Sequence, residues 1–380
     1  MSIKKTNWVS NFTLIGKAKI NDNSFKIDEI SESGWCYNSL NLNVDCGEKF
    51  GNVYANLMGG YSTKQGGLIY VHGKKDDGTD DWENTFTVDW EDRMNDDILD
   101  EVGDFCFINV GLETTENNKI YTNKFLSAYD AINYIKEHLF NDMVINVRGN
   151  MRYSFYKDGV SMQRNITSIF LSKAEPENYR ATFAQSVLLD KDSVNLKEDI
   201  DKENKILKVH GKVLDYIKEI NGVEYKAQYP LPYTFDYEFT DEKAFKNFYS
   251  LVFDVKKNVR QVNFEGEFIN SGTTVTATID DVPEDVKQLI EMGLYTEDEI
   301  LTKYASAGNV ERRCVLRRPI VKMEGGDDDL VAVPQIFNER YEDKDLEIEI
   351  ENSVSKSETV DTSSIISNDE DDDLDWLSEL

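Results

Sequence analysis

A change in hydrophobic period between residues 127 and 140 constrains the fold more than any other feature. Before it, the segments 12–20, 35–46 and 52–58 alternate apolar and polar residues, which is typical of half-buried strands. Within 127–140, five apolar residues instead share one face of a helix: Ala128, Ala131, Ile132, Ile135 and Leu139. A plain β-sandwich does not need a helix after its first strands, so the pattern favours another architecture.

A hairpin follows this predicted helix. Residues 144–156 form one arm, Lys157-Asp158-Gly159 the turn, and residues 160–171 the returning arm. An Asp-Gly pair between two strand-like segments is a strong hairpin signal. The predicted order is strand, strand, strand, helix, strand, strand, with residues 73–123 as a turn-rich, acidic insertion. Short strands are expected within it near 86–90 and 105–110.

The second half of the chain repeats this order weakly. Residues 206–213 resemble 13–18, and a hairpin follows through Asn221-Gly222. A helix is predicted over 241–253, then strands over 259–269 and 273–279. Segments 147–151 and 264–268 each follow a helix and carry a central glycine, so the two halves are expected to be one repeated unit.

This order is that of the OB-fold, a small Greek-key barrel that binds oligonucleotides. We therefore predict a mainly β (α+β) protein with two OB-like barrels, short helices and a disordered acidic C-terminal tail. The expected domains are 1–175 with its insertion, 176–323 with helices at 283–292 and 296–305, and a flexible tail over 324–380. Two unrelated β-sandwiches, or one mixed α+β domain, are the alternatives.

The charge of the chain is strongly uneven. There are 72 acidic and 42 basic residues, a net charge of −30, and a 40% hydrophobic share that is enough to build packed cores. Residues 324–380 alone hold 20 acidic and 3 basic residues, or −17. Like charges at this density repel one another, so this segment is predicted to be flexible.

One segment of this acidic chain is locally basic. Residues 143–173 contain five basic residues and one acidic residue. Alternation places five polar residues on one strand face: Arg148, Asn150, Arg152, Ser154 and Tyr156. Guanidinium groups neutralise phosphates and aromatic rings stack on bases, so this face is a candidate single-strand site. We also include four other residues in this candidate site: Lys17, Trp35, Tyr37 and Arg164. The alternative is an ordinary half-buried strand with a solvated polar face.

A second basic segment lies near the end of the body. Residues 310–323 contain Arg312, Arg313, Arg317, Arg318 and Lys322 against Glu311 alone. We include Arg312, Arg313 and Arg317 in the predicted nucleic-acid site. The alternative is a surface strand that the acidic tail neutralises. A tail that folds back onto basic patches would also weaken nucleic-acid binding, provided that it makes near-contact.

The tip of the tail combines acidic and apolar residues. It contains Asp371, Asp372, Asp373, Leu374, Asp375, Trp376, Leu377 and Leu380. Tryptophan is enriched at binding hot spots, so we predict that these residues dock into basic grooves of partner proteins. The alternative is a solvated, inert tail.

Catalytic and metal-binding patterns are not found in the sequence. The three histidines have no metal-ligand spacing, the four cysteines form no CxxC pair, and neither a Walker loop nor a GxSxG motif occurs. We expect no catalytic residues, no metal, no cofactor and no enzymatic activity. The chain has no apolar run of 18 residues and no secretory h-region, so we expect no membrane association and a cytoplasmic location.

Taken together, a β-barrel body with an arginine and aromatic strand face, followed by an acidic tail ending in apolar residues, resembles single-stranded DNA-binding proteins of bacteriophages and bacteria. The tail tip at 371–377 is similar to tails of that group, although the bacterial pattern ends in Pro-Phe. The resemblance implies sequence-nonspecific binding of single-stranded DNA, with RNA as the alternative, in phage replication and recombination, and a tail that masks the groove and recruits partner proteins. The alternative is a phage structural protein or an acidic DNA mimic that binds basic partners.

Overall fold

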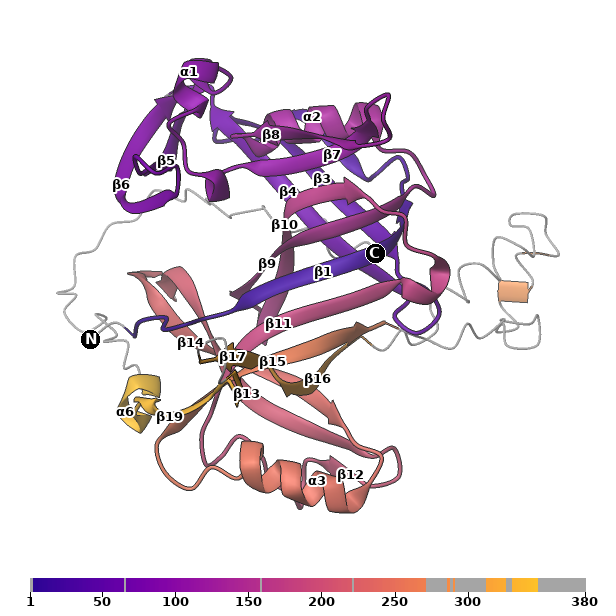
Figure 1. Cartoon of the computed structure of the whole chain (residues 1–380), viewed down its shortest axis with the longest axis vertical. Helices are drawn as coiled ribbons and strands as arrows, with labels where there is room; N and C mark the ends of the chain where they lie inside the picture. Colours follow the sequence, from indigo (N-terminus) through magenta and orange to yellow (C-terminus); the bar gives the residue numbers. More distant parts are fainter. Residues whose placement is uncertain are drawn as a thin grey trace, which may run out of the picture.

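The computed structural model describes residues 3–270 except 65, 158 and 221, then 286, 287, 290, 312–325 and 330–347. The described chain is mainly β, as predicted, and fifteen of its strands join one continuous sheet (Figure 1). This sheet curls into an upper and a lower barrel in the view of Figure 1. No helix among the described residues is long and apolar enough to cross a membrane.

Five strands close the first barrel: β1 (Ser10–Lys19), β3 (Trp35–Asp45), β4 (Asn52–Ser62), β9 (Val144–Tyr156) and β10 (Gly159–Leu171). They pair in the order β1-β3-β4-β10-β9, and β9 pairs back onto β1. Only β4 and β10 pair in parallel, and helix α2 (Ala128–His138) lies between β4 and β9 in sequence. This is the strand order predicted for an OB-fold. Strand β2 (Phe25–Ile30) pairs with β3.

Local sequence explains why these elements form. On β3, residues alternate between half-buried and fully buried along the whole strand. The Ser127 hydroxyl caps α2 by accepting a hydrogen bond of 3.1 Å from the Tyr129 amide, and Ala131, Ile132 and Ile135 are buried on the inner face of the helix. Gly149 is required because a Cβ there would lie 1.9 Å from the Asn165 carbonyl oxygen.

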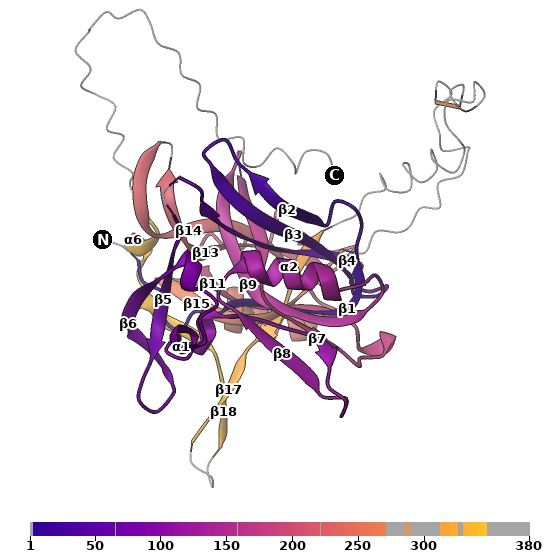
Figure 2. The same cartoon turned by 90° about the horizontal axis from the view of Figure 1, so that it is seen from above.

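The insertion between β4 and α2 forms its own small lobe. It contains β5 (Leu68–Lys74), β6 (Asp80–Asp89), η1 (Trp90–Asp92), α1 (Asp96–Leu99), η2 (Asp104–Cys106), β7 (Ile108–Thr114) and β8 (Ile120–Phe125). Strands β5 and β6 form a separate hairpin, which stands beside the barrel in Figure 2. Strand β7 instead pairs with β10, so the insertion also extends the main sheet.

The second barrel repeats the topology of the first. Its strands are β11 (Arg180–Leu189), β13 (Ile206–Ile220), β14 (Val223–Glu238), β15 (Val259–Ile269) and β16 (Arg313–Pro319). They pair in the order β11-β13-β14-β16-β15, β15 pairs with β11, and β14 and β16 are parallel. The predicted helix is present as α3 (Glu242–Phe248) with a π-helical turn, η4 (Tyr249–Phe253). Short segments η3 (Pro176–Asn178) and β12 (Ile200–Asp201) precede and follow β11.

The predicted alignment of the two halves is partly wrong. Residues 206–213 belong to β13, the second strand of its barrel, whereas β11 is the counterpart of β1. The C-terminal half of β11 is buried on both faces, so it lacks the alternation that identifies a strand. The other equivalence is confirmed, since β9 and β15 are both fourth strands. A Cβ on Gly266 would lie 2.1 Å from the Phe183 ring, so this glycine is also required.

The two barrels are joined directly. Strand β1 pairs antiparallel with β11 from Ser10 opposite Gln185 to Ile15 opposite Arg180. One hydrophobic core runs through both barrels, including Phe12 and Ile132 in the first and Phe235 and Phe264 in the second. The domain boundary near residue 175 stays a prediction.

The C-terminal part differs from a wholly flexible tail. Strands β17 (Val321–Glu324) and β18 (Val331–Pro334) form a projecting hairpin (Figure 2), β19 (Ile336–Tyr341) pairs with β15, and α6 (Asp343–Leu346) follows. Tyr341 is buried against Ile3 and Val259. The prediction of a flexible tail used only the net charge of 324–380, which carries no information about this contact. The predicted strand 273–279, the helices at 283–292 and 296–305 apart from residues 286, 287 and 290, and the tail tip lie outside the described residues.

Candidate nucleic-acid interface

The outer face of β9 has the alternation that the sequence predicts. Arg148, Asn150, Arg152 and Ser154 are exposed, while Val147, Gly149, Met151 and Tyr153 between them are buried. On β1, Thr13 lies opposite Arg148 and Asn11 lies opposite Asn150. No carboxylate of the described residues lies within ion-pairing distance of Arg148. This arginine is therefore available for an anionic ligand.

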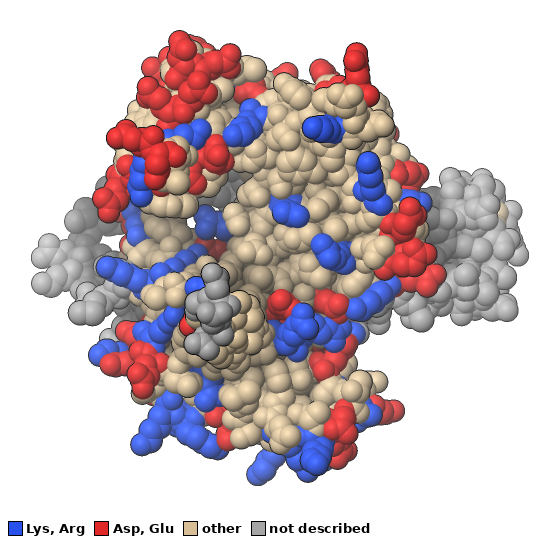
Figure 3. All heavy atoms as spheres, viewed as in Figure 1, with Lys and Arg blue, Asp and Glu red and all other residues tan. Residues whose placement is uncertain are grey.

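The strands of the first barrel are almost free of acidic residues. Their 58 residues include one carboxylate, Asp45, although the whole chain has 72 acidic residues in 380. Asp45 lies at the end of β3, where its carboxylate is 3.9 Å from Lys19 Nζ. Figure 3 shows the result on one face, with isolated Lys and Arg across a mainly uncharged middle and Asp and Glu gathered at the upper left and the right margin.

Arg152 links the two barrels. Its Nη1 lies 3.0 Å from Oδ1 of Asp215 on β13, and the Asp215 side chain is only 4% exposed. Asp215 also accepts hydrogen bonds from the backbone amides of Tyr153 and Tyr216, at 2.7 and 2.8 Å. Burial lowers the pKa of Lys5, whose Nζ is 3.7 Å from the same carboxylate. Although Arg152 is half-exposed, its charge is already used within the protein.

Aromatic side chains gather where the tip of the β9–β10 hairpin meets β14. Phe155 is 42% exposed and packs edge-to-face on Tyr229 at 5.5 Å between ring centroids, and Tyr229 packs in the same way on Tyr225. Lys157 places its Nζ 5.2 Å from the ring centroid of the predicted residue Tyr156. This aromatic tip, defined by Phe155, Tyr156, Tyr225 and Tyr229, provides π-faces and a cation in one place.

Trp35 and Tyr37 lie on the second strand of the first barrel. Their rings stack at 5.0 Å with 14° between the planes, and both are half-buried on the outer face of β3. They occupy the end of β3 that pairs with β4 and β2, whereas β1 pairs with the opposite end of β3, at Asn43 to Asp45. The structure therefore does not bring this pair next to Arg148.

Arg164 lies on the face of β10 opposite Asn165 and contacts the second barrel. Its guanidinium lies 4.2 Å from the centroid of the Phe268 ring, and Nη1 donates a hydrogen bond of 3.2 Å to the Tyr54 carbonyl. Burial lowers the pKa of Arg164. Lys17, in contrast, is half-exposed on the outer face of β1, opposite Val144 of β9.

The second basic segment is largely neutralised by its neighbours. Arg317 forms ion pairs of 2.7 Å with both Glu238 and Glu267, and Arg313 forms one of 2.8 Å with Glu238. Arg318 is paired with Glu265 at 2.7 Å. Arg312, at the start of this segment, is exposed. These pairs cross the strands of the second barrel and consume most of the positive charge that the sequence shows there.

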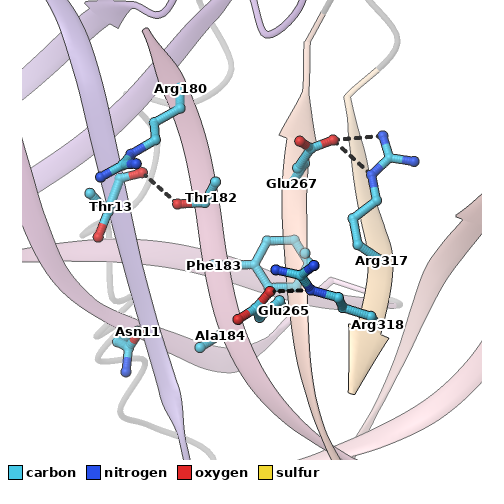
Figure 4. Close-up of a pocket in the computed structure, with 11 residues that line it drawn as sticks. Asn11, Thr13, Arg180, Thr182, Phe183, Ala184, Glu265, Glu267, Arg317 and Arg318 are labelled. Atoms are coloured by element: carbon cyan, nitrogen blue, oxygen red, sulfur yellow. Dashed lines mark hydrogen bonds and ion pairs between the residues drawn. The ribbon is translucent and has the colours of Figure 1, made fainter. Parts of the chain in front are cut away.

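A groove of about 590 Å³ crosses the junction of the barrels (Figure 4). Its walls come from β1, β11, β15 and β16, and include Asn11, Thr13, Thr182 and the paired residues Glu265 and Arg318. Arg180 also lines it, and no described carboxylate lies within ion-pairing distance of its guanidinium. Arg180 and Arg148 flank β1, opposite Ile15 and Thr13 respectively. They are thus two strand spacings, about 10 Å, apart across the sheet and two residues apart along it. The sequence prediction missed Arg180, since the first residues of β11 were not recognised as a strand.

Other predicted features give no site among the described residues. No three His, Cys, Asp or Glu side chains of the described chain are close enough together to hold a metal ion. The four cysteines are free, and burial raises the pKa of Cys46 to about 12, which keeps it a thiol. Residues 371–380 lie outside the described part.

Comparisons with known proteins add little. No protein-family model matches the sequence, and no curated protein matches it significantly. Among solved structures, the chain is similar to a deletion mutant of the single-stranded DNA-binding protein from Thermus aquaticus. The TM-score is 0.30 and the sequence identity 12%, over 69% of this chain and 87% of that one. A similarity this weak supports no conclusion about fold or function.

Proposed function

We propose that this protein binds single-stranded nucleic acid, without sequence preference, on the outer face of its first barrel. One observation carries the proposal: in a chain of net charge −30, the five strands of this barrel hold a single carboxylate, which lies beside a lysine. Carboxylates near a bound phosphodiester would repel it. Their near-absence here, beside Arg148 and Arg180, which form no ion pair with any described carboxylate, is an arrangement that favours a polyanion.

The topology supports the same function by analogy. OB-folds bind oligonucleotides on their second and third strands and the adjoining loops. In the first barrel these strands are β3 and β4, and β3 presents the stacked pair Trp35 and Tyr37. Bases stack on such rings whatever their sequence, so the interaction does not select a base.

Fluorescence anisotropy with labelled oligo-dT, a matched duplex and a matched RNA, at several salt concentrations, tests the proposal. If Lys17, Arg148 and Arg180 contact phosphates, the plot of log K against log salt has a slope of about −2 for the single strand. Arg148→Ala reduces the slope by roughly 0.7. Tighter binding to duplex, or binding that is independent of salt, contradicts the proposal. Failure to bind any of the three favours a structural protein or an acidic DNA mimic.

We also propose, from the sequence, that the acidic tail regulates this site and recruits replication or recombination proteins of a bacteriophage. A covalently attached polyanion competes with DNA at high effective concentration. Truncation after Ser367 then tightens oligo-dT binding at low salt, and the gain shrinks as salt screens the competition. Trp376→Ala with Leu377→Ala preserves the charge, so it leaves DNA affinity unchanged while abolishing partner capture. Equal partner capture by both forms contradicts the recruiting role.

A further inference from the structure

Five asparagines form one continuous row across the strands of the first barrel. In register, Asn11 on β1 is opposite Asn150 on β9, and Asn150 is opposite Asn165 on β10. Asn165 is in turn opposite Asn56 on β4, and Asn56 is opposite Asn41 on β3. Each strand of the closed barrel thus contributes one asparagine. We call these five residues the asparagine row.

All five side chains point outward and none is used by the fold. Asn11, Asn150 and Asn165 are exposed, while Asn41 and Asn56 are half-buried between fully buried neighbours. Among the described residues, none of the five side-chain amides has a hydrogen-bond partner, not even the adjacent asparagine. Each amide therefore retains one carbonyl acceptor and two N–H donors that no group of the described chain satisfies.

Strand stability does not explain the row. Asparagine is depleted in strands, because its side chain competes for backbone hydrogen bonds and packs poorly on a pleated surface. Threonine or valine at these positions would favour the barrel more. Five unfavourable residues in register, none with a partner, indicate that the row serves a ligand.

We propose that the asparagine row is the path of a single strand around the first barrel, with the amides hydrogen-bonding to the edges of the bases. This inference rests on the proposed function. A side-chain amide matches any base without selecting one, because every Watson–Crick edge presents a donor next to an acceptor and the amide can turn to meet either order. In a duplex these edges are occupied by base pairing, whereas a single strand offers its Watson–Crick edges freely. The row therefore adds a preference for single strands that charge alone does not give.

The path of the row fits a long flexible polymer rather than a compact ligand. Four strand spacings separate Asn11 from Asn41, roughly 19 Å around the barrel. Asn43 is opposite Lys19, so in this antiparallel pair Asn41 is level with position 21 of the chain. The row therefore returns to the first strand ten residues beyond Asn11, and its path around the barrel is a spiral rather than a closed ring. From Asn11 the same register runs to Ala184 on β11 and then to Glu265 and Arg318 in the groove of Figure 4.

Paired substitutions with a matched control test the inference. Asn150→Val with Asn165→Val removes two amides of the row, and Asn41→Val with Asn56→Val removes two more. Asn43→Val with Asn52→Val is the control, because these outward asparagines lie on the same strands, β3 and β4, but outside the row. Each variant is measured by thermal unfolding and by oligo-dT anisotropy at several salt concentrations.

We expect each row pair to weaken oligo-dT binding about tenfold, as two lost hydrogen bonds imply, and the control to change it less than twofold. Because the amides are uncharged, the salt slope remains that of the unmodified protein. Thermal stability is retained or raised, since valine favours strands. If row variants bind like the unmodified protein, the inference fails while the proposed function stands. If the unmodified protein binds no single strand, both fail.

Discussion

The two barrels share one topology but differ in the chemistry of their strands. The five strands of the first barrel contain one carboxylate in 58 residues, and those of the second contain seven in 59. Both have a helix between the third and fourth strands and a parallel pair between the third and fifth. The backbone plan therefore does not determine what the outer face can bind.

The second barrel uses its carboxylates internally. Glu238, Glu265 and Glu267 hold the arginines of β16, which are the residues that make the local sequence look basic. In the first barrel, Arg148 has no such partner among the described residues. The difference supports the proposal that the first barrel binds the ligand, whereas the charged residues of the second barrel pair with one another across its strands.

The largest expected effect tests the link between the barrels. Asp215→Ala leaves the buried backbone amide of Tyr153 and the partly buried amide of Tyr216 without this acceptor, and Arg152 without its partner. We expect the free energy of unfolding to fall by about 3 kcal/mol. Glu219→Ala, an exposed position on the same strand, is the control and changes stability by less than about 0.5 kcal/mol. Chemical denaturation measures the free energy of unfolding of both variants. Equal losses would show that Asp215 does not stabilise the contact between the barrels.

The second prediction reverses the charges of Arg148 and Arg180, which form no ion pair with a described carboxylate, on the proposed binding face of the first barrel. Arg148→Glu with Arg180→Glu replaces two phosphate contacts by two repulsions, so we expect at least a hundredfold loss of oligo-dT affinity, about 2.7 kcal/mol. Lys136→Glu with Lys243→Glu changes the net charge equally, at exposed helix positions. If this control pair weakens binding as much, net charge rather than the first barrel's face governs affinity.

A smaller effect is expected at the aromatic tip. Tyr156→Ala or Phe155→Ala removes one stacking ring, and either change is expected to cost about 1–3 kcal/mol of binding free energy. Tyr70→Ala on the insertion, where the ring is 82% exposed, is expected to have no effect. Anisotropy titration distinguishes them. Unchanged affinity for both tip variants would exclude the aromatic tip from the binding site.

The smallest effect is an acid sensitivity that is strongest in the second barrel, where the carboxylates with lowered pKa are partly buried. Burial raises the pKa of Glu238, but the hydrogen bonds and charges of Arg317 and Arg313 together lower it below its ordinary value. Burial likewise raises the pKa of Asp190, and Lys212 with the neighbouring hydrogen-bond donors brings it below its ordinary value. A lowered pKa stabilises the folded state above the unfolded-state pKa, and this stability is lost as pH falls through the folded-state pKa. Hydrogen exchange below about pH 4.5 is therefore expected to accelerate first in the second barrel.

Glu238→Gln tests the cause of this effect. The neutral amide cannot gain a proton, so the variant is expected to lose less stability between neutral and acidic pH than the unmodified protein. Simultaneous exchange of both barrels at every pH would show that their different carboxylate content has no consequence for stability.

Much of the fold is predictable because the local spacing of apolar residues identifies its helices and strands. The amphipathic face of Ala131, Ile132 and Ile135 locates α2, and the change of period around it determines the order of the first barrel. Strand β11 was missed as the start of the second barrel because burial on both faces removes its alternation. The burial of Tyr341 was not predicted either, because the net charge of a segment does not indicate whether a single side chain in it is buried.

The site was less predictable than the fold. Alternation alone identifies the exposed face of β9, and the structure confirms this face from Arg148 to Ser154. Ion pairs such as Arg317 with Glu267 join residues 50 positions apart, and the asparagine row joins five strands. Such contacts depend on strand register, which short-range sequence patterns do not specify.

The pairing of β1 with β11 has a consequence for how the chain is made. Residues 10–171 contain every strand of the first barrel, yet the edge of β1 from Ser10 to Ile15 obtains its second neighbour only when residues 180–189 have left the ribosome. Until then the nascent barrel exposes an unpaired strand edge, which is a template for association with other chains. Fragments ending before residue 180 should therefore self-associate during synthesis. Slow translation across 172–190 should lengthen the time for which the edge of β1 is open to association with other chains.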